Sequence, residues 1–269
     1  MNKKKIAFLL TLCMISLIAL SGVTYAGFSK QYNPQVEGLQ FNVATQENMM
    51  ISTTGVPGTF KDNIAFSDLV DGQVLLSPVQ GNITENSIAL YYDENNIASP
   101  SNYIKFSLYF SGSNDMDIYL AGSTSGTVVD PIVVQNSIFT NEQISKIVDS
   151  VRIGFLAYST RETPTGAGIE ISYDPISTNV YSVNDKTDSS YVDGIMPYHT
   201  FNAKGYTGGI DDVILLETTA NKVSKMDVYI WLEDKDISCS EDVFNSILRI
   251  NLRFLAVKNE SRVLLATGD

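Results

Sequence analysis

The chain has 269 residues, of which 44% are apolar, and its 18 Lys and Arg against 30 Asp and Glu give a formal net charge of −12. An apolar fraction this high excludes a disordered or low-complexity chain. Nucleic-acid binding is disfavoured as well, because phosphate recognition needs clustered basic residues and the net charge has the opposite sign.

The N-terminal segment is typical of a secretory signal peptide. Lysines at positions 3–5 precede an apolar run over residues 6–20, and a small-residue cleavage site ends at Ala26. The run has about 15 residues, fewer than the roughly 20 of a membrane span, so a retained anchor is the weaker alternative. We expect residues 1–26 to be removed, with membrane contact only before cleavage. Their loss takes three lysines and no acids from a charge of −12, which leaves a secreted, extracellular or cell-surface chain at −15.

Strict alternation of apolar and polar residues, the pattern of half-buried strands, dominates the chain after the signal peptide. Within residues 226–233, Val228 and Ile230 lie on one face while Asp227 and Tyr229 lie on the other. Strands are predicted at residues 36–44, 73–77, 87–92, 103–110, 117–121, 151–157, 168–173, 213–218, 226–233, 248–254 and 262–266.

Helical signals are few. Thr140 and Gln143 have capping-box spacing ahead of a short apolar stripe, which predicts a helix at residues 141–149, and residues 64–70 are a weaker candidate for a helical turn. About ten short strands separated by Gly, Asn, Asp and Pro clusters indicate an all-β fold. We expect residues 27–269 to form a single domain, an antiparallel, jelly-roll-like β-sandwich with one or two short helices.

The residue inventory disfavours catalysis. His199 is the only histidine, and Cys239 is the only cysteine once Cys13 leaves with the signal peptide. A zinc site lacks further His or Cys ligands, an internal disulfide lacks a second thiol, and no nucleophile elbow or phosphate-binding loop is present. We therefore predict that the protein is not an enzyme and assign no catalytic, cofactor-binding or metal-binding residues.

Calcium binding remains an alternative, because hard oxygen ligands in loops suit Ca²⁺. The carboxylates concerned lack the spacing of an EF-hand, and acidic loops on so negative a chain also serve solubility. The candidate groups are Asp93 with Glu94, Asp115 with Asp117, Asp211 with Asp212, Glu233 with Asp234 and Asp236, and Glu241 with Asp242.

Aromatic side chains offer a candidate glycan contact. Tyr229 and Trp231 share one face of the predicted strand at residues 226–233. The alternative is that both rings pack against the second face of the sandwich or beneath a loop, because sugar-binding platforms usually present two or three coplanar exposed rings.

Several segments are informative when taken together. They are TYAGFS at residues 24–29, the strand at residues 36–44, VYIWLEDKD at residues 228–236 followed by Cys239 and Ser240, and the strand at residues 250–254. This combination resembles exported proteins of Gram-positive bacteria in the TasA and camelysin group. The Trp-Leu-Glu stretch is similar to a W-L-E-G-E-D-x-x-C pattern of their relatives, with Asp234 in place of Gly.

The resemblance implies a jelly-roll sandwich that assembles into extracellular biofilm fibres. In that group the N-terminal segment of one subunit completes the sheet of the next. The N-L-x-P-G-D stretch of TasA itself is absent from this chain.

The residues themselves also indicate a route to assembly. After cleavage, residues 27–34 form a short polar and aromatic arm ahead of the strand at residues 36–44. Such a strand can pair with an exposed sheet edge through main-chain hydrogen bonds. The alternative is that the arm pairs within its own subunit. The candidate residues of the self-assembly strand are Val36, Leu39, Phe41 and Val43.

The expected function is that of a secreted structural protein of the cell surface or biofilm matrix, self-associating through its N-terminal strand. Its expected partners are copies of itself, as a homopolymer, or components of the cell wall or matrix, and not nucleic acid. The runner-up is a cell-surface adhesin or carbohydrate-binding module that uses Tyr229, Trp231 and the tyrosine-rich loop at residues 191–206.

Overall fold

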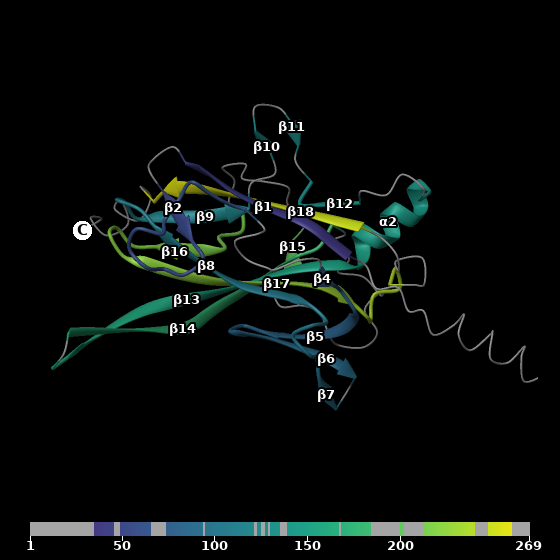
Figure 1. The fold of residues 1–269 in the computed structure, drawn as a ribbon, viewed down its shortest axis with the longest axis horizontal. Helices are drawn as coiled ribbons and strands as arrows, with labels where there is room; N and C mark the ends of the chain where they lie inside the picture. Colours follow the sequence, from purple (N-terminus) through teal and green to yellow (C-terminus); the bar gives the residue numbers. More distant parts are fainter. Residues whose placement is uncertain are drawn as a thin grey trace, which may run out of the picture. The chain divides into compact units, whose positions relative to one another are not determined.

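A computed structural model provides the structure of the chain (Figure 1). The predicted signal peptide, His199, Asp211, Glu241, Asp242 and the strand predicted at residues 262–266 lie outside the residues that it describes, as does most of the tyrosine-rich loop. The described residues are 35–45, 49–65, 74–93, 95–120, 123–124, 127–128, 130–134, 139–166, 168–183, 200–201, 212–239 and 247–259.

Among the described residues, seven strands form the first sheet. They are β1 (Gln35–Thr45), β3 (Asn63–Ala65), β4 (Val74–Leu75), β9 (Met116–Leu120), β12 (Ile132–Val134), β16 (Leu216–Thr218) and β18 (Ile247–Lys258). The strand order is β16-β9-β18-β1-β3, with β12 also beside β18 and β4 also beside β1. The sheet is mixed, because β1 and β18 run parallel.

In the part of the chain that the structure describes, nine strands form the second sheet, and β10 (Ser123–Thr124) with β11 (Thr127–Val128) forms a separate hairpin. The nine are β2 (Met50–Ser52), β5 (Pro78–Thr84), β6 (Ser87–Asp93), β7 (Asn96–Ile97), β8 (Ile104–Ser111), β13 (Val151–Thr165), β14 (Gly168–Tyr181), β15 (Thr200–Phe201) and β17 (Val223–Glu233). At the centre, β17 pairs with β13 on one edge and with β8 and then β5 on the other.

One hydrophobic core lies between the two sheets. The alternating apolar residues of β8, β17 and β18 all contribute to it, because each of these strands directs every second side chain inward. Phe254 of β18 meets Phe110 and Phe155 edge-to-face, with ring centroids 5.6 and 6.2 Å apart. The predicted alternation therefore identified the faces that build this core.

A second apolar cluster lies on the outer face of the second sheet. The β5-β6 hairpin covers this face, and its residues Val79, Ile88 and Leu90 pack against Trp231 and Leu156. The hairpin approaches closely where β13 has Gly154, since a Cβ atom there would lie 2.7 Å from the Ile88 Cδ1 atom. The strand β17 is thus buried on both faces, which its alternating sequence did not indicate.

The helix α2 (Asn141–Ser150) begins at the predicted capping box. The Thr140 hydroxyl accepts a hydrogen bond from the Gln143 N–H at 3.3 Å, and the Gln143 side chain accepts one from the Thr140 N–H at 3.0 Å. In the other predicted helical stretch, Ile64 lies in β3, and residues 66–70 are outside the described part of the chain. Among the described residues, no helix combines the length and apolar character needed to cross a bilayer.

The all-β class predicted from the sequence is confirmed. Most of the described strand pairs are antiparallel, as expected, whereas β1-β18, β5-β17 and β14-β15 are parallel pairs. The strands predicted at residues 151–157 and 168–173 are the beginnings of longer elements, since β13 and β14 form a hairpin that continues past the sheet.

Candidate functional site

The predicted assembly strand occupies a slot in the first sheet. One edge of β1 pairs in parallel with β18, and the other edge pairs antiparallel with β3 and β4. Phe41, for example, lies between Leu252 of β18 and Ile64 of β3 in the register. In the single chain the strand thus pairs within its own subunit.

In the register of β1 with β18, each of the four candidate residues of β1 lies beside a core residue of β18. The four partners in β18, Leu248, Ile250, Leu252 and Phe254, are at most 1% exposed. Their counterparts in β1 are Val36, Leu39, Phe41 and Val43, respectively.

A register shift makes this match possible. Between Val36 and Leu39, β1 advances three residues while β18 advances two, from Leu248 to Ile250. Without this irregularity, simple alternation would place Val36 out of phase with Leu39. Gly38 lies in the irregular step, but its sequence context gave no sign of a shift.

The predicted glycan contact is wrong as a surface platform. Trp231 is completely buried and Tyr229 is 6% exposed, because the β5-β6 hairpin covers the outer face of β17. The Trp231 Nε1–H donates to the Glu233 Oε2 atom at 3.0 Å, and Tyr103 stacks on Tyr229 with ring centroids 6.4 Å apart. The alternative interpretation, in which both rings pack against the second face, describes their environment.

The Trp-Leu-Glu stretch holds this cover in place. Besides the Trp231 indole, the Glu233 carboxylate accepts the Gly81 N–H of β5 at 3.2 Å and the Lys235 N–H at 3.3 Å. Burial raises the pKa of the Glu233 carboxyl, and the Trp231 hydrogen bond and the charge of Arg152 oppose that rise. The residues of this stretch that resemble the TasA and camelysin group thus make contacts that hold the fold together.

A buried ion pair follows this stretch. The Arg152 guanidinium bonds the Asp236 carboxylate, and both side chains are almost fully buried. The other Asp236 oxygen accepts the Ser238 N–H at 2.8 Å, which fixes the turn after β17. Cys239 closes this turn, and burial raises the pKa of its thiol to about 12, so it stays protonated at neutral pH.

A polar cluster that the sequence did not reveal surrounds Asp227 on the outer face of β17. Its buried carboxylate accepts hydrogen bonds from the Ser107 hydroxyl at 2.6 Å and the Tyr158 hydroxyl at 2.9 Å. The Nζ atoms of Lys225 and Lys105 lie 3.1 and 3.5 Å from its oxygens. Burial alone would raise the Asp227 pKa, but the two hydroxyls and Lys225 together lower it, so the carboxylate is ionised and compensated.

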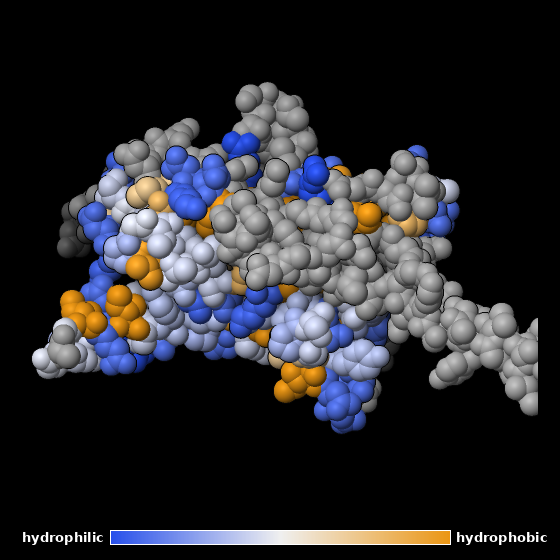
Figure 2. Space-filling view, in the orientation of Figure 1, coloured by the Kyte–Doolittle hydropathy of each residue, from blue (hydrophilic) through white to orange (hydrophobic). Residues whose placement is uncertain are grey.

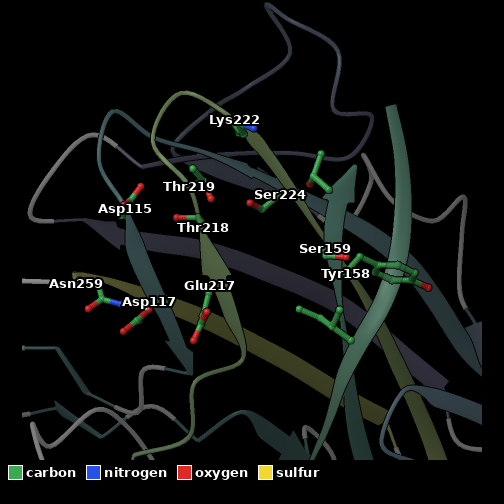
Figure 3. A pocket seen from close by; sticks show the side chains of 12 residues that line it. Asp115, Asp117, Tyr158, Ser159, Glu217, Thr218, Thr219, Lys222, Ser224 and Asn259 are labelled. Atoms are coloured by element: carbon green, nitrogen blue, oxygen red, sulfur yellow. Dashed lines mark hydrogen bonds between the residues drawn. The ribbon is translucent and has the colours of Figure 1, made fainter. Parts of the chain in front are cut away.

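A polar pocket of about 330 Å³ is lined by residues of β9, β16, β13 and β17, and Figure 3 shows its lining side chains. Two of its carboxylates support neighbouring loops, because Asp115 accepts the Ala220 N–H at 2.7 Å and Asp117 accepts an Asn259 amide N–H at 3.2 Å. The Tyr158 hydroxyl points away from the pocket toward Asp227 (Figure 3). This lining can hydrogen-bond a polar molecule.

Several of the carboxylates considered for calcium have partners within the described part of the chain. Asp93 is exposed and accepts hydrogen bonds from Asn95 and Asn96, while Asp236 is engaged with Arg152. Across the described residues, no group of three or more His, Cys, Asp or Glu side chains is arranged to hold a metal ion.

The chain itself shows no significant match to a protein-family model, to a curated protein sequence or to a solved structure.

Proposed function

We propose that the protein is a secreted structural subunit of the cell surface or biofilm matrix, with a jelly-roll-like sandwich fold, and that copies associate by exchanging β1. The observation that carries the proposal is the slot of β1 between β18 on one edge and β3 with β4 on the other. A strand held along both edges makes main-chain hydrogen bonds that depend little on which copy supplies it.

The position of β1 in the chain suits exchange. It is the first described strand, and only residues 46–49 connect it to β2 in the other sheet. A leading strand can enter a neighbouring subunit without any loop being threaded. A connection of four residues spans at most about 14 Å, so the donating subunit lies against the end of the acceptor that contains Thr45.

Exchange of β1 also explains why an assembly would add further subunits. A subunit that donates β1 leaves unpaired main-chain groups on β18 and β3, and these favour the binding of another copy of the same strand. Such a contact uses different surfaces on its two sides, so it extends into a chain of subunits unless its rotation closes a ring. An adhesin or carbohydrate-binding module is the weaker alternative, because Trp231 and Tyr229 are buried.

The proposal is tested with the chain that begins at Gly27. Negative-stain microscopy and light scattering should show filaments, and an excess of a synthetic peptide of residues 35–45 should shorten them by occupying open slots. A peptide of the same composition in scrambled order is the control. A monodisperse monomer at all concentrations, or filaments equally unaffected by both peptides, would contradict the proposal.

A further inference from the structure

The β13-β14 hairpin extends beyond every strand that flanks it. β13 pairs with β17 through Tyr158, and after that residue its described partners are in β14 alone, as far as the pair Thr165–Gly168. On the other side, β15 pairs with β14 only at Val180 and Tyr181. Figure 1 shows this two-stranded ribbon projecting at the lower left.

The projecting ribbon carries exposed isoleucines. Ile169 is 67% exposed and Ile171 is 50% exposed, although both are large apolar side chains. Figure 2 shows hydrophobic surface at this end of the molecule. Glu170 and Ser172 alternate with the isoleucines, so the apolar side chains of β14 lie on one face of the ribbon, where β13 contributes Pro164 and Glu162.

The pairing pattern shows which main-chain groups of β14 point outward. Pro164 lies opposite Ile169 and has no N–H, so these two residues cannot form a complete hydrogen-bonded pair. Because the two kinds of pair alternate in an antiparallel ribbon, Ile171 and Tyr173 are also in non-hydrogen-bonded pairs with β13. All three therefore direct their N–H and C=O groups to the outer edge, where no described strand pairs with them.

We propose that this edge pairs with the same edge of a second copy, antiparallel, with Ile171 opposite Ile171 of the second copy. In that register Ile169 lies opposite Tyr173, and the acidic Glu170 lies opposite Ser172. Gly168 lies opposite the other acid, Asp174. Apolar residues thus meet on one face, and no two carboxylates are opposed.

Neighbouring registers are disfavoured by charge. If the pairing is centred on Ser172, Glu170 lies opposite Asp174, and if it is centred on Glu170, that residue lies opposite itself. Directly opposed like charges destabilise an antiparallel pair. Of these three registers the ribbon sequence therefore favours the one centred on Ile171, and this self-complementarity points to a second copy of this chain as the occupant.

The contact is separate from the exchange of β1 and goes beyond it. It joins two ribbons around a twofold axis and therefore closes on itself, whereas strand exchange continues from copy to copy. About seven residues a side is small beside the 20–30 of a stable interface, so a single contact is weak. Between two filaments built by strand exchange, many such contacts would act together and link the filaments side by side.

Variants with one added cysteine test the register directly. Across the proposed axis, the Cα atoms of the two copies of residue 171 are about 5.5 Å apart, as in a hydrogen-bonded pair, which a disulfide can bridge. Mild oxidation of Ile171→Cys should give a covalent dimer. The matched control, Ser172→Cys, lies opposite Glu170 on the other face and should remain monomeric. Equal dimer yields from both variants, or none from Ile171→Cys, would overturn the proposal.

Charge substitutions test association without a covalent bond. Ile171→Lys and Ile171→Glu should each abolish the ribbon contact in sedimentation experiments, and an equimolar mixture should restore it by opposing unlike charges. Ile97→Lys, at a 78% exposed isoleucine of β7, should have no effect. Both experiments are run with an excess of the peptide of residues 35–45, which suppresses association through β1, so that they report on the ribbon contact whether or not β1 exchanges. Failure of the mixture to restore the contact would contradict the register.

Discussion

Gly154→Ala tests whether the β5-β6 hairpin covers the outer face of β17. The new methyl group would lie 2.7 Å from the Ile88 Cδ1 atom, closer than real carbon contacts, and 3.0 Å from the Trp231 Cζ3 atom, tighter than most of them. Overpacking of this kind costs about 1–3 kcal/mol. Alanine also lowers the conformational entropy of the unfolded chain, which offsets about 0.4–1 kcal/mol of this cost. The free energy of unfolding should therefore fall by about 1–2 kcal/mol.

The assay follows from the composition, because Trp231 is the only tryptophan and its emission reports its own burial. Urea unfolding should show an earlier midpoint for Gly154→Ala, and displacement of the hairpin should shift the native emission to the red. Gly166→Ala is the matched control, since nothing lies within 4 Å of its added methyl group. If both variants have the same stability and the same emission as the parent, the covered face is refuted.

Three further predictions concern named interactions. Asp227 has a pKa lowered from 3.8, despite its burial, by Ser107, Tyr158 and Lys225, so its contribution to stability is present above pH 3.8 and lost as the pH falls through the folded-state pKa. Asp227→Asn should therefore flatten the acid limb of stability against pH, and an unchanged slope would contradict this. Arg152→Met leaves the buried Asp236 uncompensated and should cost about 3–5 kcal/mol by urea unfolding, whereas adding Asp236→Leu should recover much of the loss. Thr140→Ala removes the capping hydroxyl and should cost about 1 kcal/mol; an equal loss from Ser145→Ala in the helix interior would argue against a capping effect.

Strand positions were accessible from the sequence because a period of two identifies the faces of a strand. Residues 104–110 and 248–254 alternate strictly, and their apolar members are in the core. The helix α2 was equally accessible, since its start depends on a local hydrogen-bond pattern between Thr140 and Gln143. These features depend on neighbours in the sequence.

The sequence did not predict the cover over Trp231, because that cover depends on the β5-β6 hairpin, which is far from Trp231 in the sequence. β5 begins with Pro78 and contains Gly81 and Asn82, which resemble a turn more than a strand, yet Gly81 is what allows close approach to Glu233. The polar residues of β17 indicated a solvent-exposed face. Asp227 is buried instead, and hydrogen bonds such as that from the Ser107 hydroxyl compensate its carboxylate. Long-range packing overrides the local pattern at these positions.

The exchange of β1 is tested most directly by asking which copy supplies it. Gln40 of β1 lies beside Asn251 of β18 in the register, at a strand separation of about 4.8 Å that a disulfide can bridge. Gln40→Cys and Asn251→Cys are made in separate chains, mixed, assembled and oxidised, with Gln40→Cys plus Lys258→Cys as the control mixture. Our account predicts a covalent heterodimer from the first mixture alone. A disulfide that forms only when both cysteines are in one chain would show that β1 stays in its own subunit and would contradict the proposed assembly.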